Sequence, residues 1–195
     1  MISAAEETTV DEGSRFPGPE FENARFGDFA PLCFSAGDRF DYAVVRGVLS
    51  QSRHAVIYRA SDLLTGLDLV IKTLDPRLND DDVASARFAR EIALTTAFNH
   101  PNLLKGLRHG KHEGVRYLIC EYLPRGTLEG ALPTHQRLPL ELVGDWLGQL
   151  AAALEYIHHR TVVHRDLKPS NVLLGPGPRR ASVKLTDFGL AFDLH

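Results

Sequence analysis

Cysteine is scarce in this sequence, which excludes a protein held together by disulfides or by cysteine-rich zinc sites. The 195-residue chain has 2 cysteines, Cys33 and Cys120, which are far apart and match no zinc motif. No apolar run approaches the length of a membrane span. Residues 1–7 also lack the basic start and apolar core of a secretory signal peptide. We therefore expect a cytoplasmic protein with no membrane segment in this chain.

Neither sign of charge dominates the chain, which gives no reason to expect nucleic acid or a membrane surface as a partner. With 22 Lys and Arg against 25 Asp and Glu, the formal net charge is −3. The charge is unevenly distributed, because residues 1–35 carry 7 acidic and 2 basic side chains, a net of −5. The remainder therefore carries about +2, which suits a domain that handles phosphates. We expect residues 1–37 to form an acidic, disordered leader.

Two kinds of apolar pattern follow the leader and predict both strands and helices. Short apolar runs separated by turn residues predict strands over residues 42–45, 55–58, 67–72, 103–109, 115–120, 172–174 and 183–186. A helix is predicted over residues 82–97, because the Asp residues at its start can cap it and favour its dipole. A longer amphipathic helix is predicted over residues 140–159, with a buried stripe at Val143, Trp146, Leu147, Leu150, Leu154 and Ile157.

Two polar motifs near the end of the sequence carry the chemistry. Residues 164–171 read His-Arg-Asp-Leu-Lys-Pro-Ser-Asn, and Asp187 begins the motif Asp-Phe-Gly after a short gap. Asp166 can accept a proton from a hydroxyl group while Lys168 neutralises charge beside it. Asn171 and Asp187 offer the oxygen ligands that Mg²⁺ prefers. A polar turn between two strands could produce either motif alone, whereas both motifs at this spacing favour a catalytic site.

With these motifs the sequence resembles the eukaryotic-type (Hanks-type) serine/threonine protein kinase family. Lys168 and Pro169 are what the serine/threonine branch carries at these positions, and they disfavour a small-molecule kinase of the same fold. The resemblance covers residues 38–195 and implies a two-lobed α+β fold. It implies a complete N-lobe at 38–120 with a five-stranded antiparallel sheet and one helix, a hinge linker at 121–126, and a partial C-lobe at 127–195.

The resemblance also implies a chain truncated shortly after the Asp-Phe-Gly motif. The later helices of a kinase C-lobe would lie beyond His195. We therefore expect the apolar stripe of the helix at 140–159, including Trp146, Leu150, Leu154 and Ile157, to lack part of its cover.

Two charged residues of the first half complete the expected catalytic set. Lys72 closes an apolar strand, and by resemblance it holds the α- and β-phosphates of ATP. Glu91 lies on the apolar face of the helix predicted at 82–97, where a carboxylate is costly unless it is paired. Lys72 is therefore its expected partner. For the two motifs, the resemblance implies the roles that the chemistry predicts. Asp166 accepts the hydroxyl proton beside Lys168, and Asn171 and Asp187 hold Mg²⁺.

The nucleotide-binding residues are likewise implied by the resemblance. Ser50, Ser52 and Ala55 stand where the family has the glycines of its phosphate-covering loop. Because glycine allows close backbone approach to phosphate, its loss predicts a stiffer loop with weaker phosphate contacts. Adenine contacts are implied at the backbone of Glu121 and Leu123 and at the side chains of Ile57, Val70 and Leu173. Simple core packing explains the last three equally well.

ATP and Mg²⁺ are therefore the expected cofactors, and a protein with a serine or threonine acceptor is the expected partner. The expected reaction transfers the γ-phosphoryl group of ATP to that hydroxyl, with little activity from this chain on its own. The retained Lys72, Glu91, Asp166, Asn171 and Asp187 favour an enzyme. The lost glycines leave an alternative open, an ATP-binding pseudokinase or regulatory interaction module without turnover. The sequence does not predict the oligomeric state.

Overall fold

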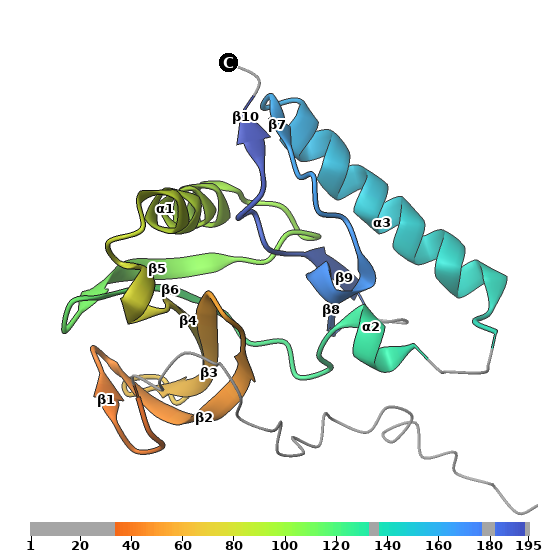
Figure 1. Ribbon diagram of the computed structural model, residues 1–195. Coiled ribbons are helices and arrows are strands. Elements are labelled where there is room, and N and C mark those ends of the chain that lie inside the picture. Colours follow the sequence, from red (N-terminus) through yellow and green to blue (C-terminus); the bar gives the residue numbers. More distant parts are fainter. Residues whose placement is uncertain (1–33, 133–136, 177–181, 194–195) are drawn as a thin grey trace, which may run out of the picture.

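The computed structural model describes residues 34–132, 137–176 and 182–193, which form two parts (Figure 1). The strands are β1 Arg39–Phe40, β2 Ala43–Gln51, β3 Ala55–Asp62, β4 Asp68–Leu74, β5 Gly106–His112, β6 Val115–Glu121, β7 Val162–Val163, β8 Val172–Gly175, β9 Ser182–Leu185 and β10 Phe192–Asp193. The helices are α1 Asp82–Ala97, α2 Leu128–Ala131 and α3 Leu140–His158, with 3₁₀ turns at Pro76–Leu78 and Pro169–Asn171. The predicted two-lobed α+β class is confirmed, while the residue boundaries of the lobes stay a prediction.

The first part is an antiparallel sheet with the strand order β1-β2-β3-β4-β6-β5. It contains the five expected strands and a sixth, β1, which was not predicted because two residues are too few to show an alternating pattern. Strand β5 begins at Gly106 instead of residue 103. The reason is that Leu103 pairs with Leu185 of β9, and the backbone N–H of Leu104 donates to the Leu185 carbonyl at 2.9 Å. This pairing joins the two parts of the fold.

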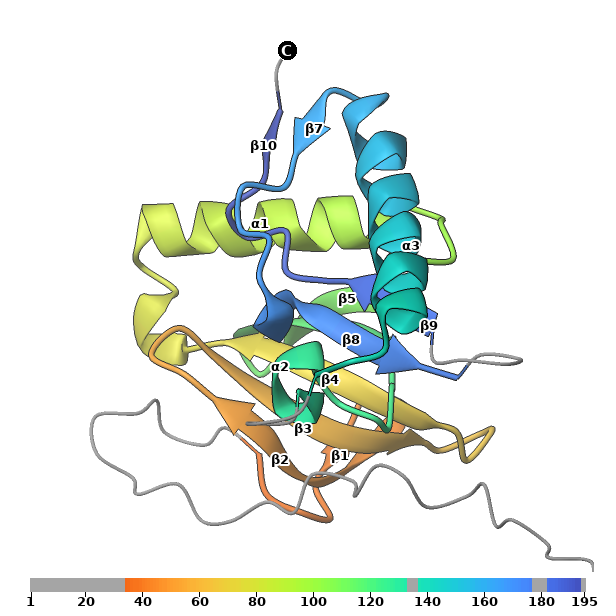
Figure 2. The ribbon, with the colours of Figure 1, turned by 90° about the vertical axis from the view of Figure 1, so that its right-hand side faces the viewer.

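Helix α1 lies across one face of the sheet (Figure 2) and has the predicted bounds. Its N-cap residue, Asp81, accepts hydrogen bonds from the backbone N–H groups of Val83 and Ala84. Its buried face consists of Phe88, Glu91, Ile92 and Thr95. Glu91 therefore lies on the buried face of the helix, where it pairs with Lys72 of β4.

The second part of the fold consists of α2, α3 and two small antiparallel sheets, β7 with β10 and β8 with β9. Within it, helix α3 buries Trp146, Leu150, Ala153 and Ile157. Leu147 was predicted in this stripe but is 61% exposed, because one residue along a helix turns the side chain about 100° away. The expectation that the stripe lacks part of its cover is wrong for Trp146, Leu150 and Ile157, which are at most 9% exposed, since strand β9 and Phe188 belong to the same buried cluster. Within the described ranges, no helix is long and apolar enough to cross a membrane.

The folded part begins earlier than the predicted end of the leader at residue 37. Residues 1–33 lie outside the described residues, but Phe34 is buried. Its ring meets Phe40 edge to face at a centroid distance of 4.7 Å and also packs against Tyr58. Phe34 stands before the first predicted strand at residues 42–45, so the strand pattern did not place it in the core.

Candidate active site

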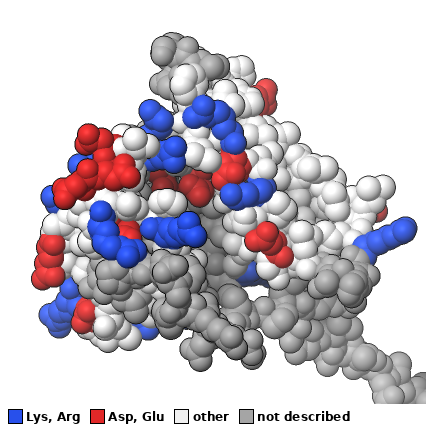
Figure 3. All heavy atoms as spheres, viewed as in Figure 1, with Lys and Arg blue, Asp and Glu red and all other residues white. Residues whose placement is uncertain are grey.

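A cleft of about 480 Å³ lies between the sheet and the second part of the fold. Its lining includes the predicted residues Ser50, Ile57, Val70, Lys72, Glu91, Glu121, Leu123, Asn171, Leu173 and Asp187. Ser52, Ala55, Asp166 and Lys168 lie outside this lining. In Figure 3, acidic side chains lie in the hollow near the middle of the visible face, with Lys and Arg side chains around it. The structure therefore gathers most of the predicted site at one place.

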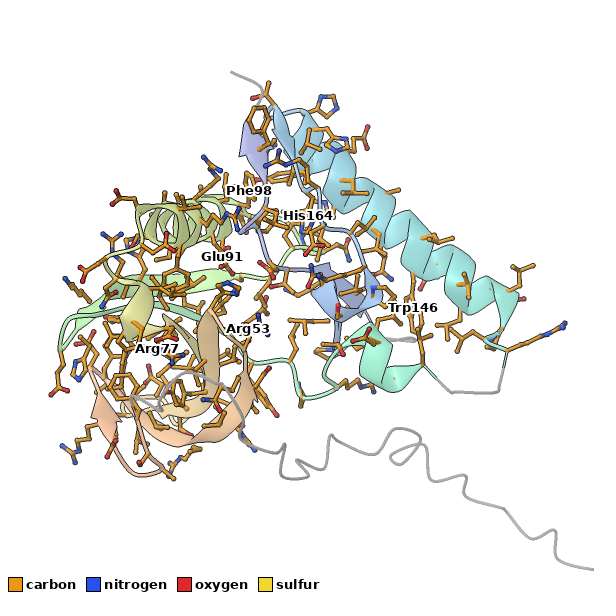
Figure 4. The ribbon with its side chains drawn as sticks, in the orientation of Figure 1. Arg53, Arg77, Glu91, Phe98, Trp146 and His164 are labelled. Carbon is orange, nitrogen blue, oxygen red and sulfur yellow. The ribbon has the colours of Figure 1, made fainter. Side chains whose placement is uncertain are left out.

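The ion pair between Lys72 and Glu91 lines the cleft where it borders the sheet and α1. Lys72 comes from β4 and Glu91 from α1, and their side chains are 19% and 8% exposed. Figure 4 shows Glu91 between α1 and the sheet. Asp187 Oδ1 lies 3.8 Å from Lys72 Nζ on the other side. Burial disfavours the charge on Lys72, but Glu91 and Asp187 outweigh it and raise the pKa of Lys72 above its ordinary value. Lys72 is therefore a fixed positive charge.

On the opposite side, the loop before β8 brings three of the predicted residues into contact. Asp166 Oδ2 accepts hydrogen bonds from Lys168 Nζ at 2.8 Å and from Asn171 Nδ2 at 2.9 Å. Lys168, together with the amide of Asn171, lowers the pKa of Asp166 below its ordinary value. Both bonds of the Asn171 amide to Asp166 use its nitrogen, so they do not require the amide oxygen. Asp166 is thus held ionised next to a cation.

His164 fixes this loop to the segment that carries Asp187. Its Nε2 donates to the Thr186 carbonyl at 3.0 Å, and its Nδ1 accepts from the backbone N–H of Asp166 at 3.3 Å. Burial lowers the pKa of His164, which favours the neutral ring that these two bonds require. The backbone N–H of Thr186 also donates to the Asn171 carbonyl at 2.9 Å. The spacing between Asp166 and Asp187 is therefore set by buried contacts.

Apolar side chains form the walls of the cleft above Lys72. Ile57 and Val70 lie on neighbouring strands of the sheet, and Leu173 faces them from β8. Cys120 also lines the cleft, and burial raises the pKa of its thiol to about 12. The thiol is protonated at neutral pH and is a poor nucleophile. These walls suit a flat apolar ring system, as was predicted for adenine.

The three residues that stand at the positions of the loop glycines have different surroundings in the structure. Ser50 lines the cleft at the end of β2. Ser52 and Ala55 instead form a closed turn, in which the backbone N–H of Ser52 donates to the Ala55 carbonyl at 2.9 Å. The predicted common role of these three residues is therefore not supported for Ser52 and Ala55, whose groups bond to each other.

Sequence reasoning missed the side chain of Glu121, for which it predicted only a backbone role. Glu121 Oε1 accepts hydrogen bonds from Lys184 Nζ at 2.6 Å and from the backbone N–H of Lys105 at 2.8 Å. Lys184 lies on β9, so this ion pair connects the end of β6 with the strand that leads to Asp187. A lysine within the apolar run 183–185 was the available signal, since a partly buried cation needs an anionic partner.

We expect the Glu121–Lys184 contact to stabilise the fold measurably. Glu121→Gln and Lys184→Met should each lower the free energy of unfolding by about 1–2 kcal/mol, because each side chain is less than a third exposed. The double variant should lose about 1 kcal/mol less than the sum of the single losses. Urea unfolding of the four chains measures this coupling, and strictly additive losses would show that the two side chains do not interact.

The donor set of the cleft fits magnesium held jointly with a nucleotide. Magnesium sites of this kind use one or two protein oxygens, with phosphate oxygens and water completing the coordination. Asn171 and Asp187 both line the cleft and can supply an amide and a carboxylate oxygen. Among the described residues there is no group of three or more His, Cys, Asp or Glu that could hold a metal ion. A site that depends on nucleotide phosphates agrees with this composition.

The cleft holds a lysine paired with a helix glutamate, an asparagine and an aspartate, and a second aspartate bonds to that asparagine at its edge. This is the residue set of a protein kinase. The protein kinase domain family matches residues 46–195 of the chain. The chain belongs to this family, in its Hanks-type serine/threonine branch.

Curated relatives support the same assignment over the matched region. An Aurora kinase of Saccharomyces cerevisiae is 33% identical over 141 residues, which are 72% of this chain and 38% of the relative. A "probable serine/threonine-protein kinase" of Streptomyces coelicolor is 34% identical over 148 residues, 74% of this chain and 22% of the relative. The probable kinase PknB of Lactococcus lactis is 33% identical over 138 residues, 70% of this chain and 22% of the relative. The chain thus spans well under half the length of these relatives.

Proposed function

We propose that the cleft binds Mg·ATP and transfers its γ-phosphoryl group to a serine or threonine hydroxyl of a protein. The observation that carries this proposal is the placement of Asp166 and Lys168 in contact, with Asn171 linking them to the cleft. A site that bound nucleotide without transfer would not need an ionised carboxylate held beside a cation at its edge.

Each residue has a proposed role that follows from its surroundings. Lys72, held by Glu91, would bind the phosphates of the nucleotide by charge. Asn171 and Asp187 would hold Mg²⁺, which neutralises phosphate charge when it is bound. Asp166 would orient the acceptor hydroxyl and take its proton, and Lys168 would stabilise the charge on the transferred group. The second candidate, a pseudokinase module without turnover, is favoured by the closed turn at Ser52 and Ala55.

The proposed partner and location follow from the family and the composition. The acceptor is a protein, and the residues 38–120, 121–126 and 127–195 are proposed to be the N-lobe, the hinge and part of the C-lobe. The scarcity of cysteine agrees with a cytoplasmic location, which remains part of the proposal.

Transfer of labelled phosphate separates the two candidate functions. The chain is incubated with Mg²⁺ and γ-labelled ATP, at protein concentrations above that of ATP so that a single turnover is visible. A mixed basic protein serves as acceptor, and the labelled amino acid is identified after hydrolysis. We expect label on serine or threonine. Binding of ATP without any label on protein would support the module without turnover and contradict the kinase.

A further inference from the structure

The hydroxyl of Ser52 is fully used within the turn that connects β2 and β3. Its Oγ donates to the Ala55 carbonyl at 3.1 Å and accepts from the backbone N–H groups of His54 at 3.2 Å and Ala55 at 3.1 Å. One donor and two acceptor positions are the full hydrogen-bonding capacity of a serine hydroxyl. The backbone N–H of Ser52 bonds to the Ala55 carbonyl as well. The N–H groups of positions 52, 54 and 55 are therefore all satisfied inside the turn.

This turn lies at the end of the cleft where phosphates would meet Lys72. In the sheet, Ser50 pairs with Ile57 and Ile57 pairs with Lys72, so these three residues form one row across β2, β3 and β4. The turn begins just beyond Ser50. Figure 4 labels Arg53 at its tip, on the side of the sheet where β8 and β9 lie. A ligand phosphate beside Lys72 would therefore lie near the backbone of the turn.

Loops that cover phosphates bind them mainly through backbone N–H groups that point at the oxygens. In this turn, the N–H groups of His54 and Ala55 can reach a phosphate only after leaving the Ser52 hydroxyl. We propose that Ser52 is a positioning residue that keeps the β2–β3 turn closed and thereby lowers the affinity of the cleft for nucleotide phosphates. This inference rests on the proposed nucleotide site, and it assigns the weak phosphate binding expected there to one hydroxyl group.

The inference concerns phosphate contacts alone, so it separates ATP from adenosine. Adenosine would use the walls formed by Ile57, Val70 and Leu173, which the turn does not include. Ser52→Ala removes the hydroxyl and frees two N–H groups, whereas Ser52→Thr retains a hydroxyl at the same position. Thr65→Ala is a matched control, because it deletes a hydroxyl that accepts a hydrogen bond from the backbone N–H of Leu67 in the exposed β3–β4 turn, outside the cleft lining.

Calorimetric titration of Mg·ATP and of adenosine into these chains tests the proposal. Ser52→Ala should bind ATP about three- to tenfold more tightly than the original chain, with adenosine affinity unchanged within about twofold. Ser52→Thr and Thr65→Ala should behave like the original chain. Hydrogen exchange at the amides of His54 and Ala55 should be faster in Ser52→Ala and unchanged in Ser52→Thr and Thr65→Ala. Ser52→Gly provides a second deletion of the hydroxyl, and the exposed turn should tolerate it.

Other results would contradict the proposed role of Ser52 or the nucleotide site itself. An equal gain for ATP and adenosine in Ser52→Ala, or no gain for either, overturns the role of Ser52 while leaving the nucleotide site intact. A gain in Thr65→Ala as large as in Ser52→Ala also overturns it. Binding of neither ligand by the original, folded chain overturns the nucleotide site and this inference with it.

Discussion

Replacing Asp166 with asparagine is expected to lower the rate of phosphoryl transfer by about 10²- to 10⁴-fold. The reason is that asparagine cannot take the proton of the acceptor hydroxyl, although it has nearly the same shape. The amide oxygen can still accept a hydrogen bond from Lys168 or Asn171, so the loop should keep its position. Single-turnover transfer of labelled phosphate measures the rate, and calorimetry measures the affinity for Mg·ATP. We expect that affinity to change by no more than about threefold.

Asp145→Asn is the matched control for this experiment. Asp145 is an exposed aspartate on α3 that accepts a hydrogen bond from Gln149, away from the cleft lining. It should keep the original rate. A rate in Asp166→Asn within about tenfold of the original would mean that another group takes the proton, and the proposed role of Asp166 would fail.

Replacing Lys72 with methionine is expected to lower the free energy of unfolding by about 3–5 kcal/mol. Methionine fills much of the same space, but it leaves the carboxylate of Glu91 buried without its cation. Against a typical domain stability of about 5–15 kcal/mol, this loss should be visible as a much lower urea midpoint. The variant Lys72→Met/Glu91→Leu should recover most of the loss, because replacing a whole buried pair by apolar groups is often neutral. Lys111→Met, an exposed lysine on β5, should change stability by less than about 0.5 kcal/mol.

The loss in Lys72→Met should also depend on pH in one direction. Burial raises the pKa of Glu91, and removal of Lys72, which acts to lower it, should raise it further. The folded variant then holds a proton that the unfolded chain releases at neutral pH. Its stability relative to the original chain should improve as the pH falls from about 8 to about 5, and decline again as the pH rises through the raised value. A loss that is the same throughout this range would show that Glu91 is not the source of the effect.

The sequence correctly predicted those features in which a polar group has few possible partners. A run of Asp residues before a periodic segment placed the start of α1 at Asp82, because few other arrangements satisfy the free N–H groups of a helix start. A lysine and a glutamate on apolar faces had to be paired, and the structure pairs Lys72 with Glu91. In both cases an unsatisfied group would be too costly to leave.

The features that were missed depend on contacts between distant or short segments. The bonds of Glu121 to Lys184 and to the backbone of Lys105 need the folded sheet, because the three residues are far apart in the sequence. The closed turn at Ser52 depends on local backbone geometry, which a sequence motif does not describe. Comparison with the motif shows only that a glycine is missing at this position. Leu147 is apolar like the other residues of the predicted stripe of α3, but it lies one residue after Trp146 and its side chain is exposed.

Titration of ATP in the presence and absence of Mg²⁺ tests most directly whether this cleft is a kinase nucleotide site. The original chain should bind ATP in a manner that depends on Mg²⁺, with affinity falling by about tenfold or more when the metal is chelated. Asp187→Asn should bind ATP as weakly with Mg²⁺ as the original chain does without it, because Asp187 is the carboxylate of the proposed metal site. Equal ATP affinity in all of these conditions, or no binding by the folded chain, would contradict the account.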